Sequence, residues 1–93
     1  GDKKMHQVHY EDILFVEAYG NYCKVYLTTE MIVSHEKISA FEDLLPADGF
    51  LRVHKSFIIA TNKIKLIEGN RITIADHKIP VGQTYKNGLK SLF

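Results

Sequence analysis

The sequence holds only one cysteine, Cys23, so the chain cannot form an internal disulfide. A lone thiol is typical of proteins in a reducing compartment, and we expect a cytoplasmic protein. The chain also lacks an apolar run near the roughly 20 residues that a membrane-spanning helix needs. No secretory signal is visible near its start. These absences argue against a disulfide-stapled secreted domain and against a helical membrane protein.

Motifs for catalysis and metal binding are missing as well. No paired carboxylates, glycine-rich phosphate loop or Ser-His-Asp arrangement stands out. Cys23 alternates with Val25 and Leu27 on an inward strand face, which is typical of a small core residue rather than a nucleophile. The histidines lack the close, recurring spacing of a zinc site, and His6 and His9 would point to opposite faces of a strand. We therefore expect no enzyme activity, no metal site and no cofactor.

The 93 residues, 45% of them apolar, have the length of one domain with a small core. Residues 1–4 resemble a tag or linker end, so the domain is expected over residues 5–93. Alternating patterns and turn residues predict short strands at 5–10, 13–17, 22–29, 31–35, 50–59 with a bend at Lys55, 64–67, 71–75 and 77–81. Helical spacing predicts a helix over 39–45 and a C-terminal helix with Thr84 as its N-cap. Because βαβ alternation is absent, the fold class is mainly β.

Charge is divided unevenly along the chain. Residues 1–50 contain four lysines against nine acids, a net charge of −5, whereas residues 51–93 contain eight bases against two acids, a net charge of +6. Such asymmetry is typical of a chain with a polyanion partner. The alternative is that the two halves neutralise each other in the fold.

The segment Phe50–Ile59 combines a core face with a basic face. Strand alternation places Leu51 and Val53 on the inward side. It places Arg52, His54 and Ser56 on the side that we expect to face water, and Lys55 stands at the bend. Basic and hydroxyl side chains presented together suit contacts with phosphates and base edges.

This segment resembles the central signature of LytTR DNA-binding domains, which are output modules of bacterial response regulators. Residues 12–22, Asp-Ile-Leu-Phe-Val-Glu-Ala-Tyr-Gly-Asn-Tyr, and residues 78–85, Lys-Ile-Pro-Val-Gly-Gln-Thr-Tyr, fit the same family in the same order. The resemblance covers roughly residues 8–93. It implies a stack of small antiparallel sheets with one short internal helix and a short C-terminal helix.

The resemblance also implies which residues contact DNA. In the family, base-edge contacts come from three loops, which carry Asn21, Lys55 and Gln83 in this sequence. Asparagine and glutamine amides pair with adenine, and lysine donates to guanine. Position 83 is commonly arginine in the family, so glutamine exchanges a guanine-preferring fork for an adenine-preferring amide. The expected phosphate-contacting or supporting residues are Tyr22, Lys24, Arg52, His54, Ser56 and Lys86, with a turn-ordering backbone hydrogen bond as the alternative role for His54.

The implied partner is double-stranded promoter DNA with direct repeats, bound by a pair of domains. A receiver domain missing from this chain would promote pairing when phosphorylated. Two other functions compete with this one. Tyr22 and Tyr26 on one strand face resemble a stacking platform for single-stranded nucleic acid, although they could simply cover a neighbouring element. The strand near Lys78 to Val81, an expected edge because of Pro80, could instead pair with another protein.

Overall fold

The computed structural model describes residues 8–92, which form eight strands, two short α-helices and three 3₁₀ turns. The strands are β1 Ile13–Tyr19, β2 Tyr22–Leu27, β3 Met31–Ser34, β4 Phe50–His54, β5 Phe57–Ala60, β6 Leu66–Glu68, β7 Arg71–Ile74 and β8 His77–Pro80. The helices are α1 Ile38–Leu44 and α2 Lys86–Lys90, and the 3₁₀ turns are η1 Tyr10–Asp12, η2 Thr61–Lys63 and η3 Gln83–Tyr85. Within residues 8–92, no helix has the length and apolar character needed to cross a membrane.

The larger sheet has five antiparallel strands in the order β3-β2-β1-β5-β4, with β1 at its centre. The pairing of β1 with β2 contains an irregularity between Ile13 and Phe15. On β5, the consecutive residues Ile58 and Ile59 are both buried, and they enter different core clusters. A strand covered on both faces needs such a continuous apolar run, because successive side chains point in opposite directions.

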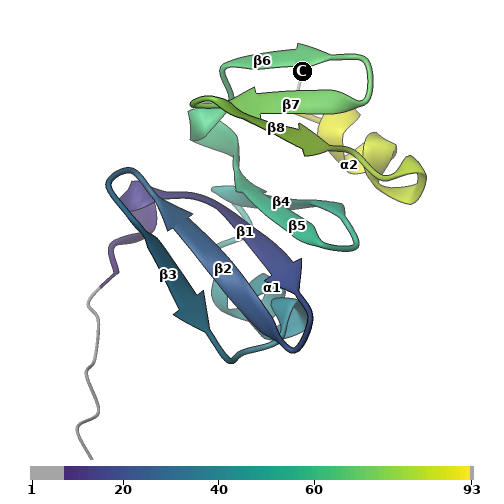
Figure 1. The fold of residues 1–93 in the computed structure, drawn as a ribbon. Coiled ribbons are helices and arrows are strands. Elements are labelled where there is room, and N and C mark those ends of the chain that lie inside the picture. The colour runs from purple at the N-terminus through teal and green to yellow at the C-terminus, as the bar shows by residue number, and fades with distance from the viewer. Residues whose placement is uncertain (1–7, 93) are drawn as a thin grey trace, which may run out of the picture.

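The five-stranded sheet is the middle layer of the domain. One face packs against α1 through a cluster of Ile13, Val16, Cys23, Val25, Leu45 and Ile58. The other face packs against the small sheet β6-β7-β8 and α2. That cluster consists of Phe15, Val53, Ile59, Ile72, Ile74, Ile79, Val81 and Leu89. Figure 1 shows the β4–β5 hairpin lying between the rest of the large sheet and the small sheet. Two layers of core therefore hold this hairpin in place.

The predicted mainly β fold with two short helices is confirmed, and so are two of the predicted turns. Gly20 between β1 and β2 has φ +63°, and Gly69 between β6 and β7 has φ +58°, a conformation that glycine adopts without steric cost. The turn between β7 and β8 lies one residue earlier than predicted. The sequence predicts it at Asp76 and His77, whereas the structure has it at Ala75 and Asp76, and Ala75, expected inside a strand, has φ +54°. The sequence pattern did not show this shift, because alanine is not a typical residue for positive φ.

The remaining local predictions concern the N-terminal strand and linker, the N-cap of the C-terminal helix and the edge position of Pro80. Of the strand predicted at residues 5–10, the structure describes residues 8–10, and these form no strand, since Tyr10 begins the 3₁₀ turn η1, Tyr10–Asp12. Residues 1–7, which include the predicted linker at 1–4, lie outside the described residues. The predicted N-cap Thr84 lies inside η3, and α2 begins at Lys86 with no side-chain cap. The expected edge position of Pro80 is confirmed, since β8 is the last strand of the small sheet.

Candidate nucleic-acid interface

Three turns lie along one flank of the molecule: the β1–β2 turn, the β4–β5 turn and the η3 segment. Figure 1 shows them at the right side of the view, one above another. Two backbone hydrogen bonds connect the elements that carry them. The Ala18 N–H donates to the Ser56 carbonyl at 2.8 Å, and the Gly82 N–H donates to the Val53 carbonyl at 2.7 Å. The β4–β5 hairpin therefore holds the other two turns beside it.

The predicted base-reading residues each occupy one of these turns. Asn21 lies in the β1–β2 turn, Lys55 in the β4–β5 turn and Gln83 at the start of η3. All three side chains are exposed, so none is used to fill the core. Three exposed residues that are far apart in the sequence thus stand in turns on the same flank (Figure 1). Their amide and ammonium groups are of the kind that can pair with base edges in a major groove.

The β1–β2 turn also carries an aromatic cluster. The Nζ atom of Lys24 lies 3.8 Å from the centroid of the Tyr19 ring, a cation–π distance. The rings of Tyr19 and Tyr22 are 5.7 Å apart. Tyr19 is 51% exposed although it lies at the end of a central strand. The sequence analysis singled out Tyr22 and Lys24 here but not Tyr19, which it counted only as part of the turn Tyr19-Gly20-Asn21.

The β4–β5 turn is cross-linked by two of its own side chains. The Arg52 Nε–H donates to the His54 carbonyl at 2.8 Å, and one Arg52 amino group donates to the Lys55 carbonyl. The His54 Nδ1 atom accepts the Ser56 N–H at 3.0 Å, so His54 does order the turn as the alternative prediction had it. Arg52 differs from the prediction that its charge faces water. Its side chain is only 15% exposed and forms an ion pair with Glu42.

Arg52 stands on the sheet face that α1 covers. It pairs with Ile58 of β5, which packs in the cluster beneath α1, and its charged partner Glu42 lies in α1. Val53, the next residue, is fully buried on the opposite face. Strand alternation therefore predicted the two faces of β4 correctly, but it did not predict that α1 lies over the face that carries Arg52.

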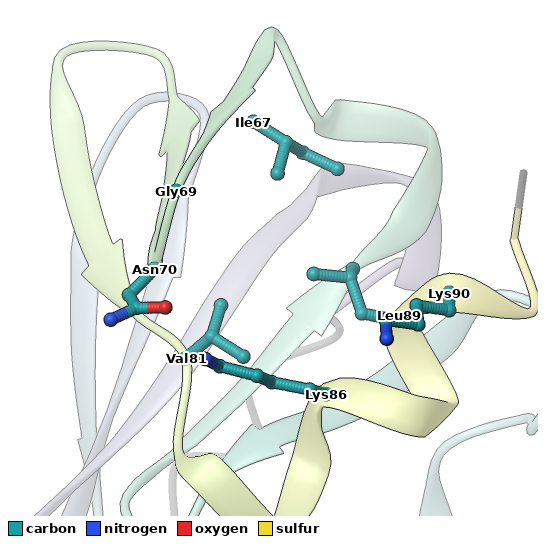
Figure 2. Close-up of a pocket in the computed structure, with 7 residues that line it drawn as sticks. All are labelled: Ile67, Gly69, Asn70, Val81, Lys86, Leu89 and Lys90. Carbon is teal, nitrogen blue, oxygen red and sulfur yellow. The ribbon is translucent and has the colours of Figure 1, made fainter.

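Lys86 follows η3 directly as the first residue of α2, and it lines a hollow between the β6–β7 turn and α2. This hollow has a volume of about 460 Å³ and is lined by Ile67, Gly69, Asn70, Val81, Lys86, Leu89 and Lys90. Figure 2 shows the Lys86 side chain extending from α2 across the hollow toward Val81 and Asn70. The assignment of Lys86 to phosphate contact stays a prediction.

A second hollow, beside Asn21, contains polar residues that sequence reasoning did not single out. Its volume is about 520 Å³, and its lining includes Asn21, His35, Lys37 and Ser39. His35 and Lys37 are exposed and belong to the β3–α1 connection. No motif in the sequence indicates them, because only the pairing of β2 with β3 brings this connection next to the β1–β2 turn.

Tyr26 does not belong to an exposed stacking platform. Its ring stacks on Phe15 with 4.3 Å between centroids, and its hydroxyl donates to Glu17 Oε1 at 3.2 Å. Burial and, to a smaller extent, the Glu17 carboxylate raise the pKa of Tyr26, so the phenol stays neutral and keeps this hydrogen bond. The prediction that this tyrosine covers a neighbouring element is confirmed, since it packs in the layer between the two sheets.

Cys23 has the environment of a core residue. Its side chain is 1% exposed and packs in the cluster beneath α1. Burial raises the pKa of the thiol, and the nearby Arg52 charge opposes this more weakly. A neutral, inaccessible thiol is a poor nucleophile. Among residues 8–92, no group of three or more histidine, cysteine, aspartate or glutamate side chains could hold a metal ion, and His6 lies outside that range.

The absence of a side chain at Gly82 lets η3 pack closely against β4. We therefore expect that a single methyl group added at this position disturbs the packing. A Cβ at this position would lie 3.0 Å from Tyr85 Cδ2 and 3.5 Å from the His54 Cα atom. Gly82→Ala is expected to destabilise the domain by roughly 1 kcal/mol through this crowding, and to weaken DNA binding by displacing Gln83. Chemical denaturation and a mobility-shift assay measure the two effects. Gly49→Ala is the control, because a Cβ there meets nothing within 4 Å; equal stability of the two variants would contradict the prediction.

Comparison with known proteins decides what kind of domain this is. Residues 3–93 match the family described as "LytTr DNA-binding domain". The chain belongs to the LytTR family of DNA-binding domains. A solved LytTr DNA-binding domain from Bacillus cereus superposes with a TM-score of 0.85, at 27% sequence identity, over 91% of this chain and 84% of that one.

Curated relatives of this LytTR domain are longer proteins. The chain is 35% identical over 91 residues to the sensory transduction protein LytT of Bacillus anthracis, covering 91% of this chain and 37% of that protein. It is 34% identical over 62 residues to the transcriptional regulatory protein NatR of Bacillus subtilis, covering 67% of this chain and 27% of that protein. The chain therefore spans between about a quarter and little more than a third of the length of these relatives.

Proposed function

We propose that this LytTR domain binds double-stranded DNA sequence-specifically, with the β1–β2 turn, the β4–β5 turn and η3 entering successive stretches of major groove. The observation that carries this proposal is the common flank of the three turns, which the two backbone hydrogen bonds from Ala18 to Ser56 and from Gly82 to Val53 tie together. A rigid arrangement of this kind suits direct readout, because the spacing between base contacts is set before DNA binds.

Each turn contributes a different contact in this proposal. Asn21 and Gln83 pair with adenine edges through their amides, and Lys55 donates to guanine O6 and N7. Phosphate contacts come from cations and hydroxyls beside the readers, for which Tyr22, Lys24, Ser56 and Lys37 are placed in or next to the turns. Arg52 and His54 act mainly by shaping the β4–β5 turn, since their polar atoms are already bonded to its backbone.

The printed names of the relatives support a regulatory role for the longer protein. LytT is named a sensory transduction protein and NatR a transcriptional regulatory protein. We propose that the chain is the output domain of a cytoplasmic response regulator, joined to a receiver domain. Two such domains would bind direct repeats in a promoter, and phosphorylation of the receiver would favour the paired state.

A second candidate function is protein pairing along β8. This strand is the last of the small sheet, and no strand within residues 8–92 pairs with its outer side. Lys78 and Pro80 are exposed along it, and both are residues that discourage edge pairing. DNA binding is therefore the better supported function.

The experiment that tests the proposed DNA contacts begins with selection of bound fragments from random duplex DNA. With the selected site, Lys55→Ala is expected to weaken binding by roughly 1–3 kcal/mol and to relax the preference at one base position, because one donor to a base edge is lost. A mobility-shift series over all four bases at each position measures both effects.

Lys65→Ala is the charge-matched control for this experiment. Lys65 is an exposed lysine just before β6, at the end of the small sheet opposite to the end where β8 leads into η3. Its loss should change affinity only slightly and relax no base position. If Lys55→Ala and Lys65→Ala behave alike, Lys55 does not read a base and the proposed set of readers is wrong.

A further inference from the structure

The guanidinium group of Arg52 lies at a junction between the reading turns and a distant helix. Three of its nitrogens are engaged: Nε with the His54 carbonyl, one amino group with the Lys55 carbonyl, and the other with Glu42 Oε1 at 2.7 Å. Its Cζ atom also lies 5.9 Å from the centroid of the Tyr85 ring in η3. One side chain thus contacts the turn that carries Lys55, the segment that carries Gln83, and α1.

The contacts with the two carbonyls control the conformation of the β4–β5 turn. Carbonyls of successive residues, His54 and Lys55, converge on one planar donor group, which constrains the peptide between them. Lys55 itself is exposed and makes no side-chain hydrogen bond within the described residues. The direction in which its side chain leaves the surface therefore depends on the backbone that Arg52 holds.

Glu42 controls the orientation of the guanidinium. It is the one acid paired with Arg52 among residues 8–92, and it approaches from α1, an element that carries none of the predicted DNA contacts. The arginine side chain is 15% exposed and the glutamate side chain 48% exposed, so the pair is partly shielded from water. Shielding strengthens the attraction between the charges relative to a pair at the open surface.

We infer that Glu42 is a positioning residue for the recognition of DNA sequence. Through Arg52 it holds the β4–β5 turn in the conformation that directs the Lys55 side chain toward the DNA base that Lys55 contacts. This inference rests on the proposed function, because it assumes that Lys55 reads DNA. The role is opposite to the one that charge alone predicts. An acid near a DNA-binding surface repels phosphates, so its neutralisation should strengthen binding to any DNA sequence.

A positioning role and simple charge repulsion predict opposite effects of neutralising Glu42 on DNA binding. Glu42→Gln, with Asp43→Asn as its matched control, can therefore distinguish them. Asp43 is the next residue of α1, is exposed, and has no ion pair among the described residues. Each substitution removes one negative charge from the same helix. Affinities are measured for the selected site and for a scrambled duplex of equal length, and the ratio of the two is the specificity.

Glu42→Gln is expected to lower the specificity by about three- to tenfold, the size of a coupling between residues in one network, while binding to the scrambled duplex is unchanged or stronger. Asp43→Asn is expected to leave the specificity unchanged. Thermal unfolding should show both variants folded, since both positions are exposed. If Glu42→Gln alters both affinities as Asp43→Asn does, the positioning role is wrong.

The same substitutions in a Lys55→Ala background separate this inference from the proposed function. Without Lys55, Glu42→Gln is expected to cause no further loss of specificity, because the side chain that it positions is absent. A specificity loss of undiminished size in that background would overturn the inference. A Lys55→Ala variant with full affinity and specificity would instead refute the proposed reading role of Lys55, whatever Glu42→Gln does.

Discussion

Phe15→Ala is expected to lower the free energy of unfolding by about 3–5 kcal/mol, the usual cost of removing a buried phenyl ring. Phe15 is 3% exposed and belongs to the core layer between the two sheets. Its ring stacks on Tyr26 at 4.3 Å and contacts the His77 ring, on β8, at 5.0 Å. Loss of the ring would leave a cavity where the small sheet packs on the large one, and chemical denaturation would measure the cost.

Two further variants test whether the loss of stability comes from the buried volume that is removed. Phe15→Leu keeps most of the buried volume and should cost clearly less than Phe15→Ala. Leu44→Ala removes a side chain that is 63% exposed, so its effect should be under about 1 kcal/mol. A Phe15→Ala domain as stable as the Leu44→Ala domain would show that the layer between the sheets does not depend on this ring.

Arg52→Ala is expected to weaken binding to the selected DNA site by about 2–3 kcal/mol, roughly 30- to 150-fold. The variant loses both donors to the carbonyls of the β4–β5 turn, and it leaves the Glu42 carboxylate without its partner. Arg52→Lys should recover little of the affinity, because an ammonium group cannot donate to two carbonyls and a carboxylate in the planar geometry of a guanidinium. Mobility-shift titration measures the affinities, and thermal unfolding confirms that each variant is folded.

Lys65→Ala is again the charge-matched control, since Lys65 is exposed, has no ion pair among the residues described and lies at the end of the small sheet opposite to η3. Its effect on affinity should be small. Full recovery of binding by Arg52→Lys would mean that positive charge, rather than the fork of donors, is what DNA binding needs at this position.

Strand alternation predicted most of the fold because burial imposes it directly. The inward face of β2, with Cys23 and Val25 buried, followed from the period of two, and glycine-containing turns at Gly20 and Gly69 followed from the need for positive φ. The shift of the β7–β8 turn by one residue onto Ala75 and the absence of a side-chain cap on α2 could not be predicted, because neither uses the residue type that usually marks such a feature.

The candidate site was predictable only in part. The residue types at Asn21, Lys55 and Gln83 followed from the family resemblance, and their exposure agrees with the prediction. The ion pair of Arg52 did not follow, because it depends on α1 packing over the sheet face that alternation alone assigned to water. Glu42 could not have been singled out at all, since an acid on the polar side of a short helix is ordinarily a solvated residue.

The sequence by itself determined which residues enter the core and which turns interrupt the strands, since both depend on local pattern and on the conformational range of single residues. Tertiary structure decided which turns become neighbours and which polar groups are already engaged. Those properties depend on the order of strands in the sheet and on hydrogen bonds between segments that are distant in the chain. For this reason the sequence indicated a basic segment, whereas only the folded chain showed that its arginine shapes the turn beside it.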